Sequence, residues 1–198
     1  GRRMGLGDRP NAGRRGEGFY RYFLRAWMGS FWAGLQADNV VRSRKSPSPV
    51  AWTHPYLGYF GGAVVALSLI WISVGLEAVF AYVLIAGFAQ SQIFLADYVQ
   101  HYGLVRSVDA SGRAEPVGPV HSWNAPHWFS SAMMLNAPRH SDHHLHPTRR
   151  YPELRLHPGM PVLPYSLPVM ATIALVPPLW RRMMARRLAL LGQSDPMA

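Results

Sequence analysis

The sequence contains no cysteine, and this absence narrows the chemistry that the chain can perform. Disulfides, thiolate zinc sites and cysteine-held iron–sulfur clusters are all excluded within these 198 residues. A transition metal bound here must therefore use imidazole or carboxylate ligands, which suit iron, zinc or copper. Motifs for a nucleophilic serine, a P-loop and a dinucleotide-binding turn are also absent. The sequence thus gives no support to serine hydrolysis or phosphoryl transfer.

Charged residues are scarce as well, at 15% of the chain against about 25% in an ordinary soluble domain. Hydrophobic residues reach 49%, and this balance is typical of a protein embedded in a bilayer. Acidic residues number 10 against 20 basic ones, which leaves a formal net charge of +10. The basic residues flank apolar segments, and no nucleic-acid recognition motif accompanies them. We interpret them as the cytoplasmic flanks of a membrane protein in contact with anionic lipid.

One apolar stretch is long enough to cross a membrane twice. Over residues 56–95 the sole charged residue is Glu77, and about 40 residues suit two spans of about 20 each. Gly75 permits a tight turn between helices predicted over residues 56–74 and 76–96. Because this turn carries no Lys or Arg and both outer ends do, we expect it to face away from the cytoplasm. The alternative is a buried helical hairpin of a large soluble protein.

The remaining segments are predicted to be loops and helices at the membrane interface. The stretch "FYRYFLRAWMGSFWAGL" spaces its aromatic residues at helical intervals and keeps Arg21 and Arg25 on a polar side, which predicts an amphipathic interfacial helix over residues 19–35. Prolines interrupt the later apolar stretch, so we expect residues 160–192 to hold an interfacial helix around 166–176 and a basic tail. Loops or linkers are predicted over residues 1–18, 42–55 and 107–120.

Histidines are concentrated in the stretch "RHSDHHLHP", which contains the pattern H-x-x-H-H. His140, His143 and His144 share one helix face, where they can converge on one or two metal ions. His101, at the end of the apolar hairpin, is expected to supply a further ligand from a separate element. Candidates for partners of the outer ring nitrogens are Asp97, Asp142 and His121. The alternative is a solvated, pH-sensitive loop, which is the interpretation preferred for His54, His146 and His157.

At this point three stretches resemble a known family: "DYVQHYGLVR", "HSWNAPHWFSSAMMLNAPRHSDHH" and "HPTRRYPELR". They are similar to the C-terminal half of the membrane-bound alkane 1-monooxygenases, which belong to the histidine-rich membrane fatty acid desaturase/hydroxylase superfamily. In that family an H-Y-G element and an N-x-x-R-H-S-D-H-H box supply ligands to a non-haem diiron centre. The resemblance implies iron ligation by His101, His140, His143 and His144. It covers nearly the whole chain and is most specific over residues 136–150.

The resemblance also implies a reaction and partners. One oxygen atom of O2 would enter the terminal C–H bond of a medium- or long-chain alkane and give a 1-alkanol. Electrons would come from a rubredoxin or ferredoxin with its NAD(P)H-linked reductase, which we expect to dock on basic residues such as Arg149 and Arg150. The alternatives are a membrane fatty-acid desaturase or hydroxylase, and a non-catalytic membrane protein whose histidines bind zinc or sense pH.

The chain departs from the family's pattern in two respects. The family's first two histidine boxes are absent, and Gln100 stands where a Glu commonly precedes the H-Y-G histidine. The sequence does not begin with Met, so we expect it to be the C-terminal part of a longer enzyme whose activity needs the missing part. The alternative is a truncated product that cannot hold two irons alone.

The predicted fold is all-α: an integral membrane helical bundle with one transmembrane hairpin and further cytoplasmic and interfacial helices. Residues 1–198 would form part of a single desaturase/hydroxylase-like domain. Its metal-binding region, over residues 97–157, would lie on the cytoplasmic side of the inner membrane.

Overall fold

The computed structural model describes residues 13–45, 51–107, 109–111 and 115–192. Helices are the regular elements of this part of the chain, and isolated bridge residues include the parallel pair Asn124 and Val162. The prediction of an all-α fold is therefore confirmed over these ranges. The loops predicted over residues 1–18 and 107–120, and the linker predicted over 42–55, fall partly outside the described residues.

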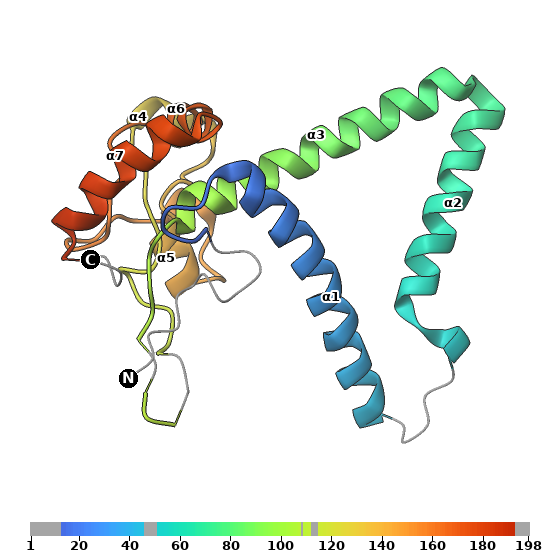
Figure 1. Cartoon of the computed structure of the whole chain (residues 1–198), viewed down its shortest axis with the longest axis horizontal. Helices are drawn as coiled ribbons and strands as arrows, with labels where there is room; N and C mark the ends of the chain where they lie inside the picture. Colours follow the sequence, from blue (N-terminus) through green and yellow to red (C-terminus); the bar gives the residue numbers. More distant parts are fainter. Residues whose placement is uncertain (1–12, 46–50, 108, 112–114, 193–198) are drawn as a thin grey trace. The chain divides into compact units, whose positions relative to one another are not determined.

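The chain divides into two compact units, and the long helices α1 (Phe19–Lys45) and α3 (Leu76–His101) each contribute to both (Figure 1). The first unit comprises residues 1–27 and 94–198, and the second comprises residues 28–93. The second unit holds η2 (Ala51–Thr53) and α2 (Pro55–Val74). The first unit holds α4 (Trp128–Met133), α5 (His140–Leu145), η3 (Tyr151–Glu153), α6 (Leu167–Ala174) and α7 (Pro177–Leu190).

The first unit is built around an aromatic core. The ring of Tyr98, near the end of α3, lies 5.0 Å from that of Tyr22 in α1 and 5.5 Å from that of Trp180 in α7, between centroids. Trp180, Met184 and Leu188 recur every four residues and form the buried stripe of α7. The segment predicted as a basic tail is thus a helix whose apolar face packs inside the protein.

The helix α1 differs from its prediction in length and in packing. It was expected over residues 19–35 but continues to Lys45, so the first residues of the predicted linker are helical. Phe19 and Tyr22 are buried in the core of the first unit, whereas Trp32 is exposed. The aromatic spacing that predicted an interfacial helix therefore serves packing within the protein over the first turns.

The helices α2 and α3 are long and apolar enough to cross a membrane. The Nδ1 of His54 accepts a hydrogen bond from the backbone N–H of Tyr56 at 3.2 Å, which caps α2, and Pro55 occupies its first turn. Gly75, with φ of 115°, separates the two helices in a conformation that favours glycine.

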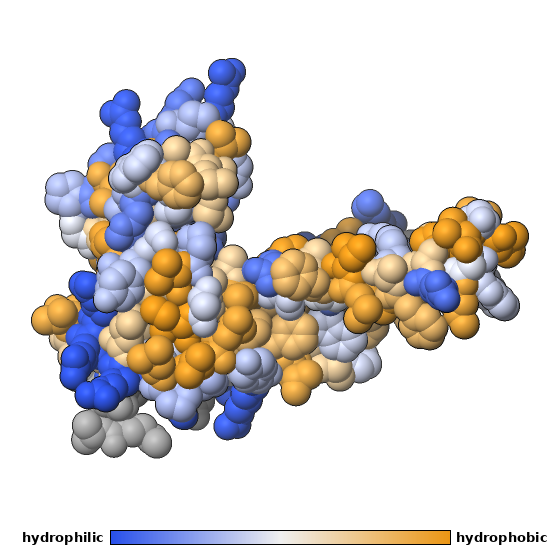
Figure 2. All heavy atoms as spheres, turned by 90° about the horizontal axis from the view of Figure 1, so that it is seen from above, coloured by the Kyte–Doolittle hydropathy of each residue, from blue (hydrophilic) through white to orange (hydrophobic). Residues whose placement is uncertain are grey.

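Most side chains of α2 are exposed. No residue of this helix is buried, and the right-hand part of Figure 2, which contains it, is largely hydrophobic on the face shown. Water disfavours an apolar surface of this size, whereas the hydrocarbon core of a bilayer matches a 20-residue helix in both length and polarity. The chain is accordingly a helical membrane protein.

Candidate metal centre

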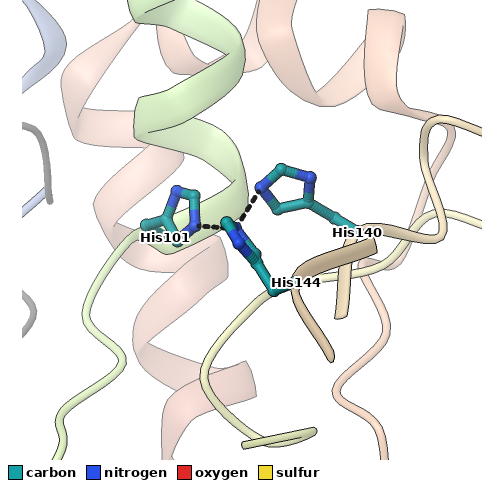
Figure 3. Close-up of side chains that lie close together, drawn as sticks. All are labelled: His101, His140 and His144. Carbon is teal, nitrogen blue, oxygen red and sulfur yellow. Dashed lines mark hydrogen bonds between the residues drawn. The ribbon is translucent and has the colours of Figure 1, made fainter. Parts of the chain in front are cut away.

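Three histidines from two helices point ring nitrogens toward one another (Figure 3). The Nε2 of His144 lies 3.1 Å from the Nε2 of His101 and 3.0 Å from the Nε2 of His140. One ligand atom from each ring lies within 4.8 Å of the other two. His101 ends α3, and the other two belong to α5, so this histidine cluster joins two elements that are about 40 residues apart in sequence.

The separation of these nitrogens fits a single metal ion. Nitrogens bound at about 2.1 Å from one ion lie about 3.0–3.4 Å apart in octahedral or tetrahedral geometry. Burial, together with the neighbouring histidines, lowers the pKa of His140 well below its ordinary value. The ring of His140 therefore stays neutral at pH 7, which is the form that binds a metal. The histidine cluster is a three-nitrogen donor set that suits iron, zinc or copper.

Local structure explains how each ring reaches the cluster. His140 and His144 are four residues apart on α5 and therefore share one face of the helix. The helix α3 continues past its predicted end at Ala96, which keeps His101 on its last turn. Gly103 then ends the helical path with φ of 69°, and a Cβ there would lie 2.6 Å from Cδ1 of Leu188. Glycine is the residue that fits both the backbone and the space.

A loop with buried polar residues ties the end of α3 to the start of α5. The Trp123 indole donates to the carbonyl of Tyr102 at 2.9 Å, and its backbone N–H donates to the carbonyl of Gln100 at 2.8 Å. The adjacent Asn124 is fully buried; its Oδ1 accepts the backbone N–H of Ser141 at 3.0 Å, and its Nδ2 donates to the Ser141 hydroxyl at 2.8 Å. Two consecutive loop residues thus hold both ligand-bearing helices.

Comparison with known proteins assigns a family to this arrangement. The family model described as fatty acid desaturase matches residues 2–187. The chain belongs to the fatty acid desaturase family. The matched range includes the histidine cluster, both apolar helices and nearly all of α7.

Several relatives of this desaturase-family chain are named alkane 1-monooxygenase. The protein from Pseudomonas putida is 34% identical over 88% of the chain and 44% of its own length. Alkane 1-monooxygenase 1 of Alcanivorax borkumensis is 35% identical over 90% of the chain and 44% of its own length. The xylene/toluene monooxygenase hydroxylase component of P. putida is 29% identical over 87% and 45%. The resemblance seen in the motifs is confirmed, and the chain spans about half the length of the relatives it matches.

Of the four ligands predicted for this desaturase-family chain, His143 lies outside the histidine cluster. Its ring stacks on Tyr151 with centroids 5.3 Å apart and an interplanar angle of 19°. Its centroid is 6.1 Å from that of His140 and 5.8 Å from that of His144. Among the described residues no hydrogen-bond partner faces its buried Nδ1. Metal ligation by His143 stays a prediction.

Asp97 and His121, both predicted to bond the outer ring nitrogens of the ligands, have different contacts in the structure. The Oδ1 of Asp97 lies 2.8 Å from the Nδ1 of His101, which leaves Nε2 of that ring facing the cluster. His121 instead pairs through Nε2 with Glu115 at 2.9 Å and accepts the backbone N–H of Gly118 through Nδ1 at 2.8 Å. Asp97 is thus the outer partner of a cluster histidine, whereas His121 fixes the loop that precedes Trp123.

Asp142, the third predicted outer partner, holds the segment that follows α5. Its fully buried carboxylate accepts bonds from Nη1 of Arg149 at 2.6 and 2.8 Å, from the backbone N–H of Arg155 at 2.8 Å and from Nδ1 of His146 at 2.9 Å. Burial raises the pKa of Asp142, but these donors outweigh burial and hold the pKa below its usual range. His146 is 48% exposed, in agreement with the solvated position expected for it, and it also contacts this carboxylate.

The residues that brace the cluster were not predicted from the sequence. Asn124 and Ser141 are neutral and unremarkable in the sequence, and Arg149 was interpreted as a docking residue. The available signal was an asparagine next to a tryptophan in an apolar stretch, since a polar side chain among buried neighbours needs hydrogen-bond partners.

Proposed function

We propose that this chain forms part of a membrane-bound, non-haem iron monooxygenase that converts a medium- or long-chain alkane and O2 into a 1-alkanol. The convergence of His101, His140 and His144 carries the proposal, because it occurs in a desaturase-family chain whose relatives are named alkane 1-monooxygenase. A donor set of imidazoles without thiolates suits a non-haem iron ion. Bound iron would supply the activation of O2.

We assign His143 to a second iron ion. A buried ring nitrogen without a hydrogen-bond partner is costly, and a ligand on that ring would relieve the cost. Its ring centroid lies 6.1 Å from that of His140 and 5.8 Å from that of His144, which suits an ion adjacent to the first. The relatives are about twice as long as this chain, so we propose that further histidine ligands come from a part of the protein outside these 198 residues.

The residues of this chain hold and orient the metal and give access to the substrate. Asp97 fixes the Nδ1 side of His101 and so keeps the Nε2 lone pair available. An alkane dissolves in the bilayer that surrounds α2 and α3, and can therefore reach the protein without crossing water. The basic residues Arg42, Arg44 and Lys45 before α2, and Arg106 after α3, favour a cytoplasmic position of these helix ends in the inner membrane.

Electrons are proposed to come from an acidic rubredoxin or ferredoxin, supplied by an NAD(P)H-linked reductase. Arg150 is exposed and suits such a contact, whereas Arg149 is paired with the buried Asp142. Arg150→Glu should weaken carrier binding in a titration at low salt, because it reverses a surface charge. An affinity equal to that of the unsubstituted protein would count against this docking site.

The function is tested by metal content and product analysis on the intact membrane protein. Purified protein should contain iron and form 1-octanol from octane in the presence of O2 and a reduced carrier. His101→Ala, His140→Ala and His144→Ala should each lose iron and product. His127→Ala, at an exposed histidine that caps α4 without a side-chain hydrogen bond, is the matched control and should retain both. Iron-free active protein, or variants that keep their iron, would contradict the proposal.

A fatty-acid desaturase or hydroxylase is the second candidate, favoured by the family whose model matches the chain. The same protein preparation distinguishes the two candidates. An unsaturated or hydroxylated acyl chain, in place of 1-octanol, would identify the second.

A further inference from the structure

A line of close polar contacts runs from α1 to the histidine cluster. The Tyr22 hydroxyl donates to Oδ2 of Asp97 at 2.9 Å. The other oxygen of that carboxylate, Oδ1, lies 2.8 Å from Nδ1 of His101. The Nε2 of His101 in turn faces His144 at 3.1 Å. A side chain about 75 residues away in sequence therefore acts on the orientation of a cluster histidine.

The position of the Tyr22 hydroxyl is set by tight packing. The side chain is fully buried, and its ring lies 5.0 Å from that of Tyr98. The guanidinium carbon of Arg25 lies 5.5 Å from the ring centroid, and Arg25 is itself held by Glu17 at 2.7 and 2.9 Å. Because this surrounding network is already fixed in the fold, the hydroxyl donates to Asp97 with little further loss of conformational entropy.

The Tyr22 hydroxyl restricts the orientation of the Asp97 carboxylate, which burial alone does not fix. Its side chain is 28% exposed, so water competes for both oxygens and the carboxylate has room to rotate. A donor that occupies Oδ2 leaves Oδ1 directed at the Nδ1–H of His101. The backbone carbonyl oxygen of Asp97 also lies 3.0 Å from Nδ1 of His101. Both acceptors favour the tautomer with a free Nε2 lone pair, which is the one that binds a metal on the cluster side, and the carboxylate adds a second restraint on the ring.

We propose that Tyr22 is a positioning residue of the metal centre: through Asp97, its hydroxyl orients the His101 ring toward the ion. The inference rests on the proposed function, since it takes His101 as a ligand. It adds to the centre a residue of α1, which carries none of the clustered histidines.

The test compares two tyrosine variants of the intact membrane protein, each of which loses one buried hydroxyl and its hydrogen bond. Tyr22→Phe removes the hydroxyl on Asp97. Tyr98→Phe removes an equally buried hydroxyl from the same aromatic core, which donates to the backbone carbonyl of Glu17 at 2.6 Å. The readouts are the Kd for Fe2+ and the ligand-field spectrum of bound Co2+, with thermal unfolding recorded for both variants. Loss of core stability should be similar in the two.

Tyr22→Phe should weaken metal binding by about threefold to tenfold and shift the Co2+ spectrum, whereas Tyr98→Phe should stay within about twofold of the unsubstituted protein. Direct partners of metal ligands affect affinity by about 10–100-fold, and Tyr22 acts one bond further out. Asp97→Asn should therefore weaken binding more than Tyr22→Phe. If the two tyrosine variants weaken metal binding equally while Asp97→Asn still weakens it, the role proposed for Tyr22 is wrong and that of Asp97 stands. Failure of the unsubstituted protein to bind either metal would overturn the proposed function and this inference with it.

Discussion

In the first unit the apolar side chains of Tyr22, Trp180 and Met184 are fully buried in protein, whereas in the second unit those of Ile72 and Leu84 are 81% and 73% exposed. Both sets come from apolar helical stretches. The difference is the medium that surrounds them: protein encloses the first set, and hydrocarbon suits the second. The first unit also buries polar groups, such as Asn124 and Asp142, that need partners within the protein. The histidine cluster lies in this first unit, where polar groups are held by the fold.

The largest effect is expected from removing the buried carboxylate of the first unit. Asp142→Ala leaves Arg149 and the backbone N–H of Arg155 without their acceptor, and breaking a buried charge pair costs about 3–5 kcal/mol. Thermal unfolding in detergent should show a marked loss of stability. Asp109→Ala, at an exposed aspartate in the same unit, should change the midpoint little. Similar midpoints for the two variants would mean that burial of the carboxylate does not matter.

A matched pair of truncations tests the contrast between the units directly. Met184→Ala should cost about 2–5 kcal/mol, because it opens a cavity in the aromatic core. Leu84→Ala, at a side chain that is 73% exposed in α3, should lower the free energy of unfolding by no more than about 0.5 kcal/mol. Denaturation of both variants in the same detergent measures the difference. A large loss at Leu84 would show that this face of α3 is packed against protein in the intact molecule.

The assignment of α2 to the bilayer is tested by a charge at its centre. Val65→Arg places an arginine near the middle of a 20-residue helix, where insertion costs about 2.5–3.5 kcal/mol. The fraction of protein recovered in membranes should fall, whereas Val65→Leu should leave it unchanged. Equal recovery of the two variants would argue against a span at α2.

The smallest effect is expected from the loop that joins the two ligand-bearing helices. Asn124→Ala removes four buried hydrogen bonds, including both contacts to Ser141, at a cost of about 1–3 kcal/mol. Since these bonds fix the start of α5, iron affinity should fall together with stability. Isothermal titration with Fe2+ measures this coupling. If the variant is destabilised but its affinity for Fe2+ is unchanged, the loop does not support the metal centre.

Much of the helical architecture was predictable because its signals are local. The apolar run ending near Leu95 and the break at Gly75 predicted two helices that the structure contains as α2 and α3. The spacing of His140 and His144 was sufficient to predict that they share a face. The prediction was incomplete where local signals compete: the helix predicted over residues 19–35 extends to Lys45, and Tyr22 is buried in the core. Aromatic residues suit both a membrane interface and a protein core, and composition does not distinguish these.

The contact of Asp97 with His101 was predictable from the sequence, whereas the partners of Asp142 were not, although both residues were identified as candidates. Asp97 lies four residues before His101 and meets it through helical geometry alone. Asp142 is also within a helix, but its partners Arg149 and Arg155 lie beyond the end of α5. Their positions depend on the path of a loop, which is set by long-range contacts.

The sequence by itself determined which atoms can bind a metal, because the absence of cysteine leaves imidazole and carboxylate, and it determined which helices are apolar enough to enter a bilayer. The tertiary structure decided which three histidines meet, that His143 stays apart from them, and that Tyr22 reaches the centre through Asp97. The physical reason is that helix periodicity relates residues a few positions apart, whereas contacts across about 40 or 75 positions depend on how the loops close and how the core packs.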